Sequence, residues 1–163
     1  MAQISDALVQ EMLLGRHIAS LATENADGST HMVAVWFYFD GESVYVATAG
    51  RSRKAQNVQR SSRVSLMVDA RDLAGQRGIC LTGTARLLTG APSSDWNEKV
   101  HDKYLSTAAL ADPRVGPVFA QWDDVTIQIT PSSVIAWDLR EADRQFFGGA
   151  LSSNPEYLLP LDR

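Results

Sequence analysis

Three cationic side chains gather where a helix is expected to begin, in the segment TAGRSRKAQN that spans residues 48–57. Arg51, Arg53 and Lys54 surround Ser52, whose residue type is typical of a helix N-cap. This end of a helix is positive, so cations there are unfavourable by roughly 0.3–1 kcal/mol each. Free backbone N–H groups with Arg and Lys beside them instead suit a bound phosphate. The cluster predicts an anion site, and a solvated basic loop is the alternative.

Neighbouring residues add to this anion site. Thr48 and Ser52 place a hydroxyl donor on either side of the turn, and Gly50 allows a close approach of the backbone to a ligand. The sequence has no GxxxxGK[ST] motif, which argues against a P-loop nucleotidase. It also has no G-x-S-x-G elbow for a serine hydrolase.

The composition is that of one ordinary globular domain. The chain has 163 residues, of which 45% are hydrophobic and 21% are charged, so we expect a single domain over residues 1–163. The net charge of -4 argues against nucleic acid or an anionic membrane as a partner. The single cysteine, Cys80, excludes an internal disulfide and favours a cytoplasmic location. The first residues lack the pattern of a signal peptide.

The elements that must position the cations are mainly strands. Apolar runs separated by turn residues predict an antiparallel meander, and closure into a barrel would remove its exposed edges. We therefore predict a mainly β fold, a six-stranded antiparallel split barrel with short helices, with a bulge or close approach at Gly83. Helices are expected from about Ser5 to Gly15, Ser52 to Arg60, Pro92 to Leu105 and Pro113 to Gln121, and residues 140–163 could form a C-terminal arm. The predicted strands are His17–Thr23, Thr30–Phe39, Ser43–Thr48, Arg63–Val68, Ile79–Leu88 and Val125–Thr130, the last continued or followed by Val134–Trp137.

The strand predicted for residues 30–39 is apolar on both faces. Such a strand is covered on both sides, here by a barrel core and by a cofactor or partner subunit. Among its residues we select Trp36 as a substrate-pocket wall and His31 as a group that faces the cofactor. Alternation places Met32, Ala34, Trp36 and Tyr38 on one face and Val33, Val35, Phe37 and Phe39 on the other.

Three segments resemble a known family. Residues 48–54 read T-x-x-x-S-R-K and are followed by Ala55 and by RVSL at 63–66, which resembles the flavin-binding split barrel of pyridoxamine 5'-phosphate oxidase. HMVAVW at 31–36 falls where that family has R-M-V-L-L-K. LATENADGSTHMV is similar to the L-A-T-x-x-x-D-G-x-P-H segment of flavin and deazaflavin reductases. The resemblance covers about residues 5–90.

The resemblance implies a homodimer with the cofactor in a groove between the subunits. By position, Arg53 and Lys54 would hold the cofactor phosphate, with Thr48 and Ser52 as hydroxyl donors. The family's ring-contacting glutamine falls at Gly78, so Gln76 is a possible substitute. The backbone that would run along the isoalloxazine ring belongs to Met32, Val33, Ala34 and Val35.

Two departures bear on the substrate. His31 stands where the oxidase has arginine, and Trp36 stands where it has the lysine that grips the vitamin phosphate. Of the oxidase's C-terminal substrate motif, only AWDLR at 136–140 lies in the corresponding region. The sequence therefore resembles the branch of flavin- or F-420-dependent reductases, some of which share K-A-x-N-x-x-R-x-x-R-V-S, more than a true pyridoxamine 5'-phosphate oxidase.

These residues predict an oxidoreductase that transfers a hydride between a flavin-type cofactor and a small conjugated or aromatic substrate. The T-x-x-x-S-R-K register favours FMN, and coenzyme F-420 is the alternative cofactor. A dimer that binds or senses a flavin or haem without turnover is the alternative function. His17, His31 and His101 lack zinc-site spacing, a structural or surface role is favoured for His101, and no metal is expected.

Overall fold

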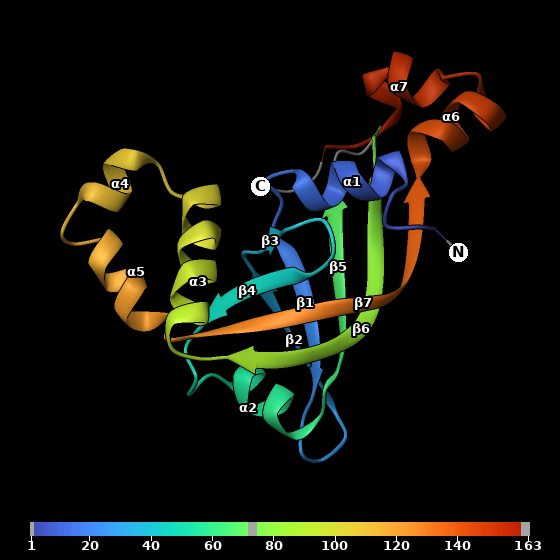
Figure 1. Ribbon diagram of the computed structural model, residues 1–163. Helices are drawn as coiled ribbons and strands as arrows, with labels where there is room; N and C mark the ends of the chain where they lie inside the picture. The colour runs from blue at the N-terminus through green and yellow to red at the C-terminus, as the bar shows by residue number, and fades with distance from the viewer. Residues whose placement is uncertain (1, 72–74, 161–163) are drawn as a thin grey trace.

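The computed structural model describes residues 2–71 and 75–160 of the chain. Within them, one antiparallel sheet with strand order β2-β1-β5-β6-β7-β4-β3 curls into a half-barrel (Figure 1). The predicted mainly β class is confirmed, but the sheet has seven strands and not six. The strands are β1 (Ala19–Glu24), β2 (Thr30–Val35), β3 (Tyr38–Phe39), β4 (Val44–Thr48), β5 (Arg63–Ala70), β6 (Arg77–Leu88) and β7 (Val125–Asp138).

The seventh strand arises because the predicted strand of residues 30–39 divides at Trp36 and Phe37. Its first half, β2, pairs with β1, whereas its second half, β3, pairs with β4. Since β2 and β3 are the two edges of the sheet, one extended segment joins both edges and bends the sheet round the core. An apolar pattern shows that a segment is extended, but not where it changes partner.

The core lies inside the curl. Most inward-facing positions of the strands are buried, and burying each large aliphatic side chain stabilises the fold by about 1.5–3 kcal/mol. Val134, near the end of β7, also reaches this core, so the segment at 134–137 continues the predicted strand. The largest fully buried side chains include Phe37, Met12, Leu13, Leu21, Leu66, Ile79, Leu81, Ile127 and Ile129.

Gly83 interrupts the pairing of the two longest strands. The register of β6 against β7 shifts between Thr82 and Gly83, which confirms the predicted bulge. A Cβ added at Gly83 would collide with the backbone carbonyl of Thr130 and would lie 3.0 Å from the Cα of Pro131. The glycine is therefore needed because the backbone of β7 passes too close to leave space for a side chain.

We expect Gly83→Ala to lower the free energy of unfolding by about 1–3 kcal/mol, the usual cost of forcing extra atoms into a packed site. Chemical denaturation measures the change. Thr84→Val is the matched control, because Thr84 is exposed on the same strand. Equal stability of Gly83→Ala and the wild type would contradict the close approach.

Helices cover the ends and one side of the sheet. The helix α1 (Ala7–Leu14) lies near one end of the half-barrel and α2 (Arg53–Arg60) near the other (Figure 1). Between β6 and β7 the chain forms α3 (Ala91–Tyr104), α4 (Thr107–Ala111) and α5 (Gly116–Trp122). Helix α3 packs against β4 and β7, and α4 and α5 complete a helical layer beside it.

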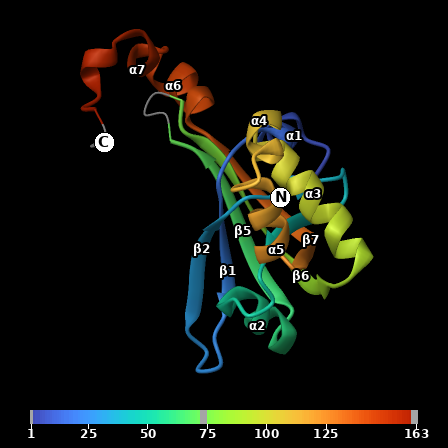
Figure 2. The ribbon, with the colours of Figure 1, turned by 90° about the vertical axis from the view of Figure 1, so that its left-hand side faces the viewer.

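The segment that follows β7 turns away from the sheet. It forms α6 (Leu139–Phe147), α7 (Ala150–Ser153) and a 3-10 turn at Pro155–Tyr157. In both ribbon views these helices project past the end of the sheet (Figures 1 and 2). Among the described residues, no helix has the length and apolar character needed to span a membrane.

Candidate functional site

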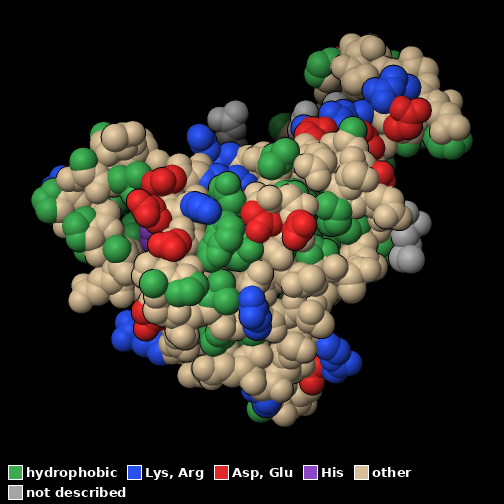
Figure 3. Space-filling view, in the orientation of Figure 1, with side chains coloured by type: hydrophobic (Ala, Val, Ile, Leu, Met, Phe, Trp, Pro, Cys, Tyr) green, Lys and Arg blue, Asp and Glu red, His purple; other side chains and the backbone are tan. Residues whose placement is uncertain are grey.

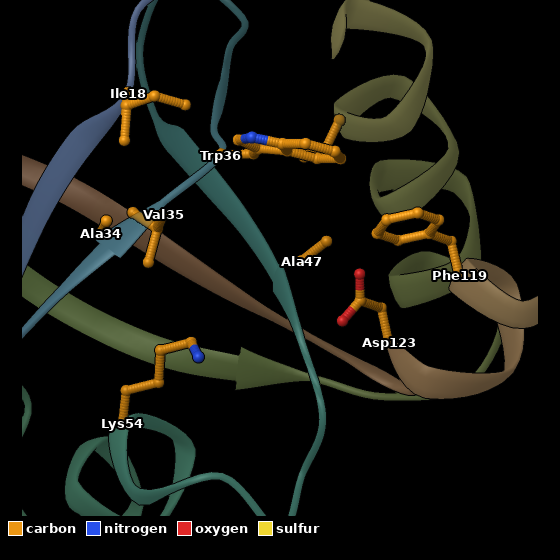
Figure 4. A pocket seen from close by; sticks show the side chains of 9 residues that line it. Ile18, Ala34, Val35, Trp36, Ala47, Lys54, Phe119 and Asp123 are labelled. Carbon is orange, nitrogen blue, oxygen red and sulfur yellow. The ribbon is translucent and has the colours of Figure 1, made fainter. Parts of the chain in front are cut away.

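A cavity of about 320 Å³ lies at the end of β2, where α2 and α5 approach the sheet (Figure 4). This volume falls within the range of about 300–1,000 Å³ that is usual for small-molecule sites. Its walls are mostly apolar, with one cation and one carboxylate among them. The lining residues are Ile18, Ala34, Val35, Trp36, Ala47, Lys54, Val100, Phe119 and Asp123.

An aromatic stack forms one wall of the cavity. The Trp36 ring lies 5.0 Å from that of Tyr104, within 5° of parallel, and 5.5 Å from that of Phe119. The Tyr104 hydroxyl donates to the carbonyl of His17 at 2.5 Å and accepts the N–H of Phe37 at 3.4 Å. Burial raises the pKa of Tyr104 to about 12, so the phenol stays neutral. The stack presents a rigid, flat surface suited to a planar conjugated molecule.

Lys54 enters the cavity from α2, on the side opposite Asp123 (Figure 4). Helix α2 begins after Ser52, whose Oγ accepts the N–H of Ala55 at 3.3 Å, as the N-cap prediction requires. The Lys54 side chain is half-buried, and this desolvation lowers the pKa of its ammonium, while Asp123 acts in the opposite sense. Within residues 2–71 and 75–160, its Nζ has no hydrogen bond or ion pair, so a donor is available to a ligand.

Arg53 faces a different direction from Lys54, because successive residues of a helix project about 100° apart. Arg53 is exposed near the turn between β1 and β2. There the pKa of Asp27 is lowered, mainly by the Ser29 hydroxyl and to a small extent by Arg53. The hydroxyl oxygens of Ser52 and of buried Thr48 lie in the same region, 3.1 Å apart. The predicted phosphate-binding pair is thus divided. Lys54 lines the cavity, whereas Arg53 lies outside it.

Two acidic residues follow α5 and take different roles. Asp123 Oδ2 lies 2.8 Å from Nε2 of His101, which is buried on α3. Asp124 Oδ1 accepts the N–H of Gly50 at 2.6 Å and so ties the loop before α2 to β7. A Cβ at Gly50 would lie at a tight 3.3 Å from Val125 Cγ1 and at an ordinary contact distance of 3.5 Å from that oxygen. The two carboxylates thus link α3 and the loop before α2 to the start of β7, although Asp124 itself stays exposed.

The cavity unites four of the predicted site residues: Ala34, Val35, Trp36 and Lys54. His31 is half-buried further along β2, and Met32 is 65% exposed on the outward face of that strand. Gln76 precedes β6, and its carbonyl accepts the N–H of Leu139 at 2.8 Å. The predicted residues that do not line the cavity of this chain are His31, Met32, Val33, Thr48, Ser52, Arg53 and Gln76.

Sequence reasoning did not find Phe119 and Asp123. Phe119 lies on an expected helix, but the sequence carries no signal that this helix folds back over β2. Among the described residues, no group of three or more His, Cys, Asp or Glu side chains is placed to hold a metal ion. A planar ring against β2, with an anionic group near the start of α2, fits the donors and the shape that are present.

Two curated relatives match about half of the chain. The F420H(2)-dependent biliverdin reductase of Mycobacterium tuberculosis (strain CDC 1551 / Oshkosh) is 42% identical over 82 residues, 49% of this chain and 56% of that protein. The FMN-binding protein of Nitratidesulfovibrio vulgaris (strain DSM 19637 / Miyazaki F) is 31% identical over 85 residues, 50% of this chain and 66% of that protein. The matched part thus spans less than two thirds of either relative.

The fold is also found among solved structures. The structure of a conserved hypothetical protein from Mycobacterium tuberculosis superposes with a TM-score of 0.71 and 24% identity, covering 86% of this chain and 88% of that one. At this identity the likeness concerns the fold alone. The family description of pyridoxamine 5'-phosphate oxidase matches residues 5–138, from α1 to the end of β7. Because this match takes in most of the chain, the protein belongs to the pyridoxamine 5'-phosphate oxidase family.

Proposed function

We propose that the protein is an oxidoreductase that uses FMN or coenzyme F-420 to transfer a hydride to or from a small, conjugated or aromatic organic substrate. The observation that carries this proposal is the half-buried ammonium of Lys54, which faces an aromatic-walled cavity without a partner among the described residues. An unpaired cation in such a place costs free energy, so a bound acceptor explains its position.

The residues present would hold the cofactor in two parts. Arg53, the hydroxyls of Thr48 and Ser52 and the first N–H groups of α2 would bind the phosphate. Ala34 has no side chain beyond Cβ, so the ring could lie against the backbone of β2, with Lys54 at its edge. When bound, the cofactor supplies the hydride chemistry. The names of the two curated relatives, one F420H(2)-dependent and one FMN-binding, support this class of cofactor.

The cavity favours a neutral, planar substrate. Trp36 and Phe119 offer stacked rings, while the charges of Lys54 and Asp123 balance one another. A phosphorylated substrate such as pyridoxamine 5'-phosphate would face the Asp123 carboxylate with Lys54 as the single cation among the lining residues. The biliverdin named for one relative shares the conjugation of this class but not its neutrality, because it carries two propionate groups.

We also propose a homodimer. Met32 and Ile135 expose 65% and 62% of their surface on outward strand faces, where a second copy would cover them. Size-exclusion chromatography with light scattering measures the assembly, and a monomer at all concentrations would contradict this part of the proposal.

Spectral titration tests the proposed function. We expect the purified protein to carry, or to take up on titration, one equivalent per chain of FMN or F-420, seen as flavin bands or as the single deazaflavin band. The loaded, reduced protein should then be reoxidised by biliverdin. Tight binding without turnover would favour the non-catalytic alternative, and a Soret band would favour haem. A protein that binds neither FMN nor F-420 contradicts the proposal.

A further inference from the structure

We propose that Asp123, resupplied by His101, donates the proton that accompanies hydride transfer to the substrate. The inference rests on the proposed function, because that function assigns the hydride to the reduced cofactor. It adds an acid group and a path for the proton, both made of residues of α3 and the end of α5.

Asp123 lies in the wall between two cavities. Its carboxylate projects into the cavity of Trp36 and Lys54 from the side opposite Lys54 (Figure 4). The same residue lines a second cavity of about 370 Å³ among α3, α4 and α5. Its Oδ2 is 2.8 Å from His101 Nε2, and the side chain of His101 is 6% exposed. A hydrogen-bonded acid–base pair therefore connects the cavity proposed for the substrate with the second cavity.

The second cavity provides the route to solvent. His101 lines it, so a proton that leaves Nε2 can be replaced from that side. Acidic side chains gather over α3 on the face shown in Figure 3, with a basic side chain beside them. The titratable groups that line the two cavities are Lys54, Glu98, His101, Asp102 and Asp123.

The position of Asp123 is fixed by a buried network. Asn97 Nδ2 donates to the Asp123 carbonyl at 2.6 Å, and Thr126 Oγ1 donates to Asn97 Oδ1 at 2.6 Å. Asn97 and Thr126 are both buried. The His101 ring also lies 5.4 Å from the ring of Phe119, which stacks on Trp36. The acid is thus held rigidly relative to the aromatic wall, as proton transfer requires.

The proposed step balances in atoms and electrons. As the π bond of the substrate breaks, the hydride and its electron pair form a C–H bond at one atom. The electron pair of the π bond takes a proton at the other atom from Asp123, whose carboxylate receives that proton from the His101 imidazolium. The imidazole left neutral is reprotonated through the second cavity, and the Asp123 carboxylate, across the cavity from Lys54, keeps its charge.

Two substitutions test the inference, with biliverdin as the probe substrate and the reduced form of whichever cofactor binds. Asp123→Asn should lower kcat by about 100-fold or more, as expected for loss of a general acid. It should also flatten the decline of kcat with rising pH that loss of the donated proton causes. His101→Gln retains a hydrogen-bond donor to Asp123 but no transferable proton, so kcat should fall with little change in KM. Asp95→Asn, on the exposed side of α3, is the matched control and should match the wild type.

A second readout does not depend on turnover. In the proton NMR spectrum, His101 Nε2–H should give a downfield, slowly exchanging resonance that is lost in Asp123→Asn. Cofactor affinity measured in the same variant separates loss of the proton donor from loss of binding. Normal kcat in Asp123→Asn, or an unchanged pH profile in both variants, overturns the proton donor while leaving the proposed function intact. A wild-type protein that binds no cofactor refutes the proposed function itself.

Discussion

Replacing Lys54 with alanine is expected to weaken cofactor binding by roughly 10- to 150-fold, since a hydrogen bond to a charged group contributes about 1.5–3 kcal/mol. The fold should not lose stability, because desolvation lowers the pKa of this ammonium and so makes its charge a cost in the folded protein. That cost is present below the folded-state pKa and disappears as the pH rises above the unfolded value, so the variant should be at least as stable as the wild type near neutral pH. Spectral titration and thermal melting measure the two effects.

A pair of ligands separates the two cations of α2. FMN carries the phosphate, whereas riboflavin has the same ring without it. Arg53→Ala should weaken FMN binding alone, while Lys54→Ala should weaken both ligands, because Lys54 reaches the cavity and Arg53 does not. Arg86→Ala removes an equal charge from an exposed position on β6 and serves as the control. Wild-type affinity for both ligands in Lys54→Ala would show that the cation does not serve the cofactor.

The second large effect is expected at Phe37. Phe37→Ala should lower the free energy of unfolding by about 3–5 kcal/mol, as is usual for removing a buried aromatic ring. Phe37 is fully buried where the chain passes from β2 to β3. Its ring also lies 4.0 Å from the Lys103 ammonium, and its N–H reaches the Tyr104 hydroxyl. The substitution therefore loosens both edges of the sheet together with the aromatic wall.

Denaturant unfolding measures this change in Phe37→Ala. Phe146→Ala is the control, because the Phe146 side chain on α6 is 72% exposed and its loss should be nearly neutral. If the two variants are equally stable, burial of Phe37 between β2 and β3 does not stabilise the half-barrel.

The local features of the fold were predictable from the sequence. The Ser52 cap, the bulge at Gly83 and the strand at residues 125–130 each depend on a few adjacent residues. The division of residues 30–39 was not predictable, because it depends on β1 and β4, which are distant partners. The count of six strands was wrong for that reason alone.

The same distinction applies to the site. Lys54 and Trp36 could be selected because each stands in a recognisable local pattern. Asp123 could not, since an acidic pair before a strand usually lies in solvent, and only the packing of α3 against β4 and β7 brings His101 to it. Lys54 and Arg53 are adjacent in sequence, yet their separation in space follows from the helix geometry.

The helices α3, α4 and α5 interrupt what is otherwise a long hairpin. Strands β6 and β7 pair from Arg77 with Asp138 to Leu88 with Thr126, so residues 89–124 leave and re-enter the sheet at neighbouring points. Exchanging this segment for that of a relative would thus replace Phe119, Asp123 and the second cavity while β2 and α2 stay as they are. Under the proposed function, we expect such an exchange to change which substrate is accepted while the residues of β2 and α2 proposed to hold the cofactor are kept.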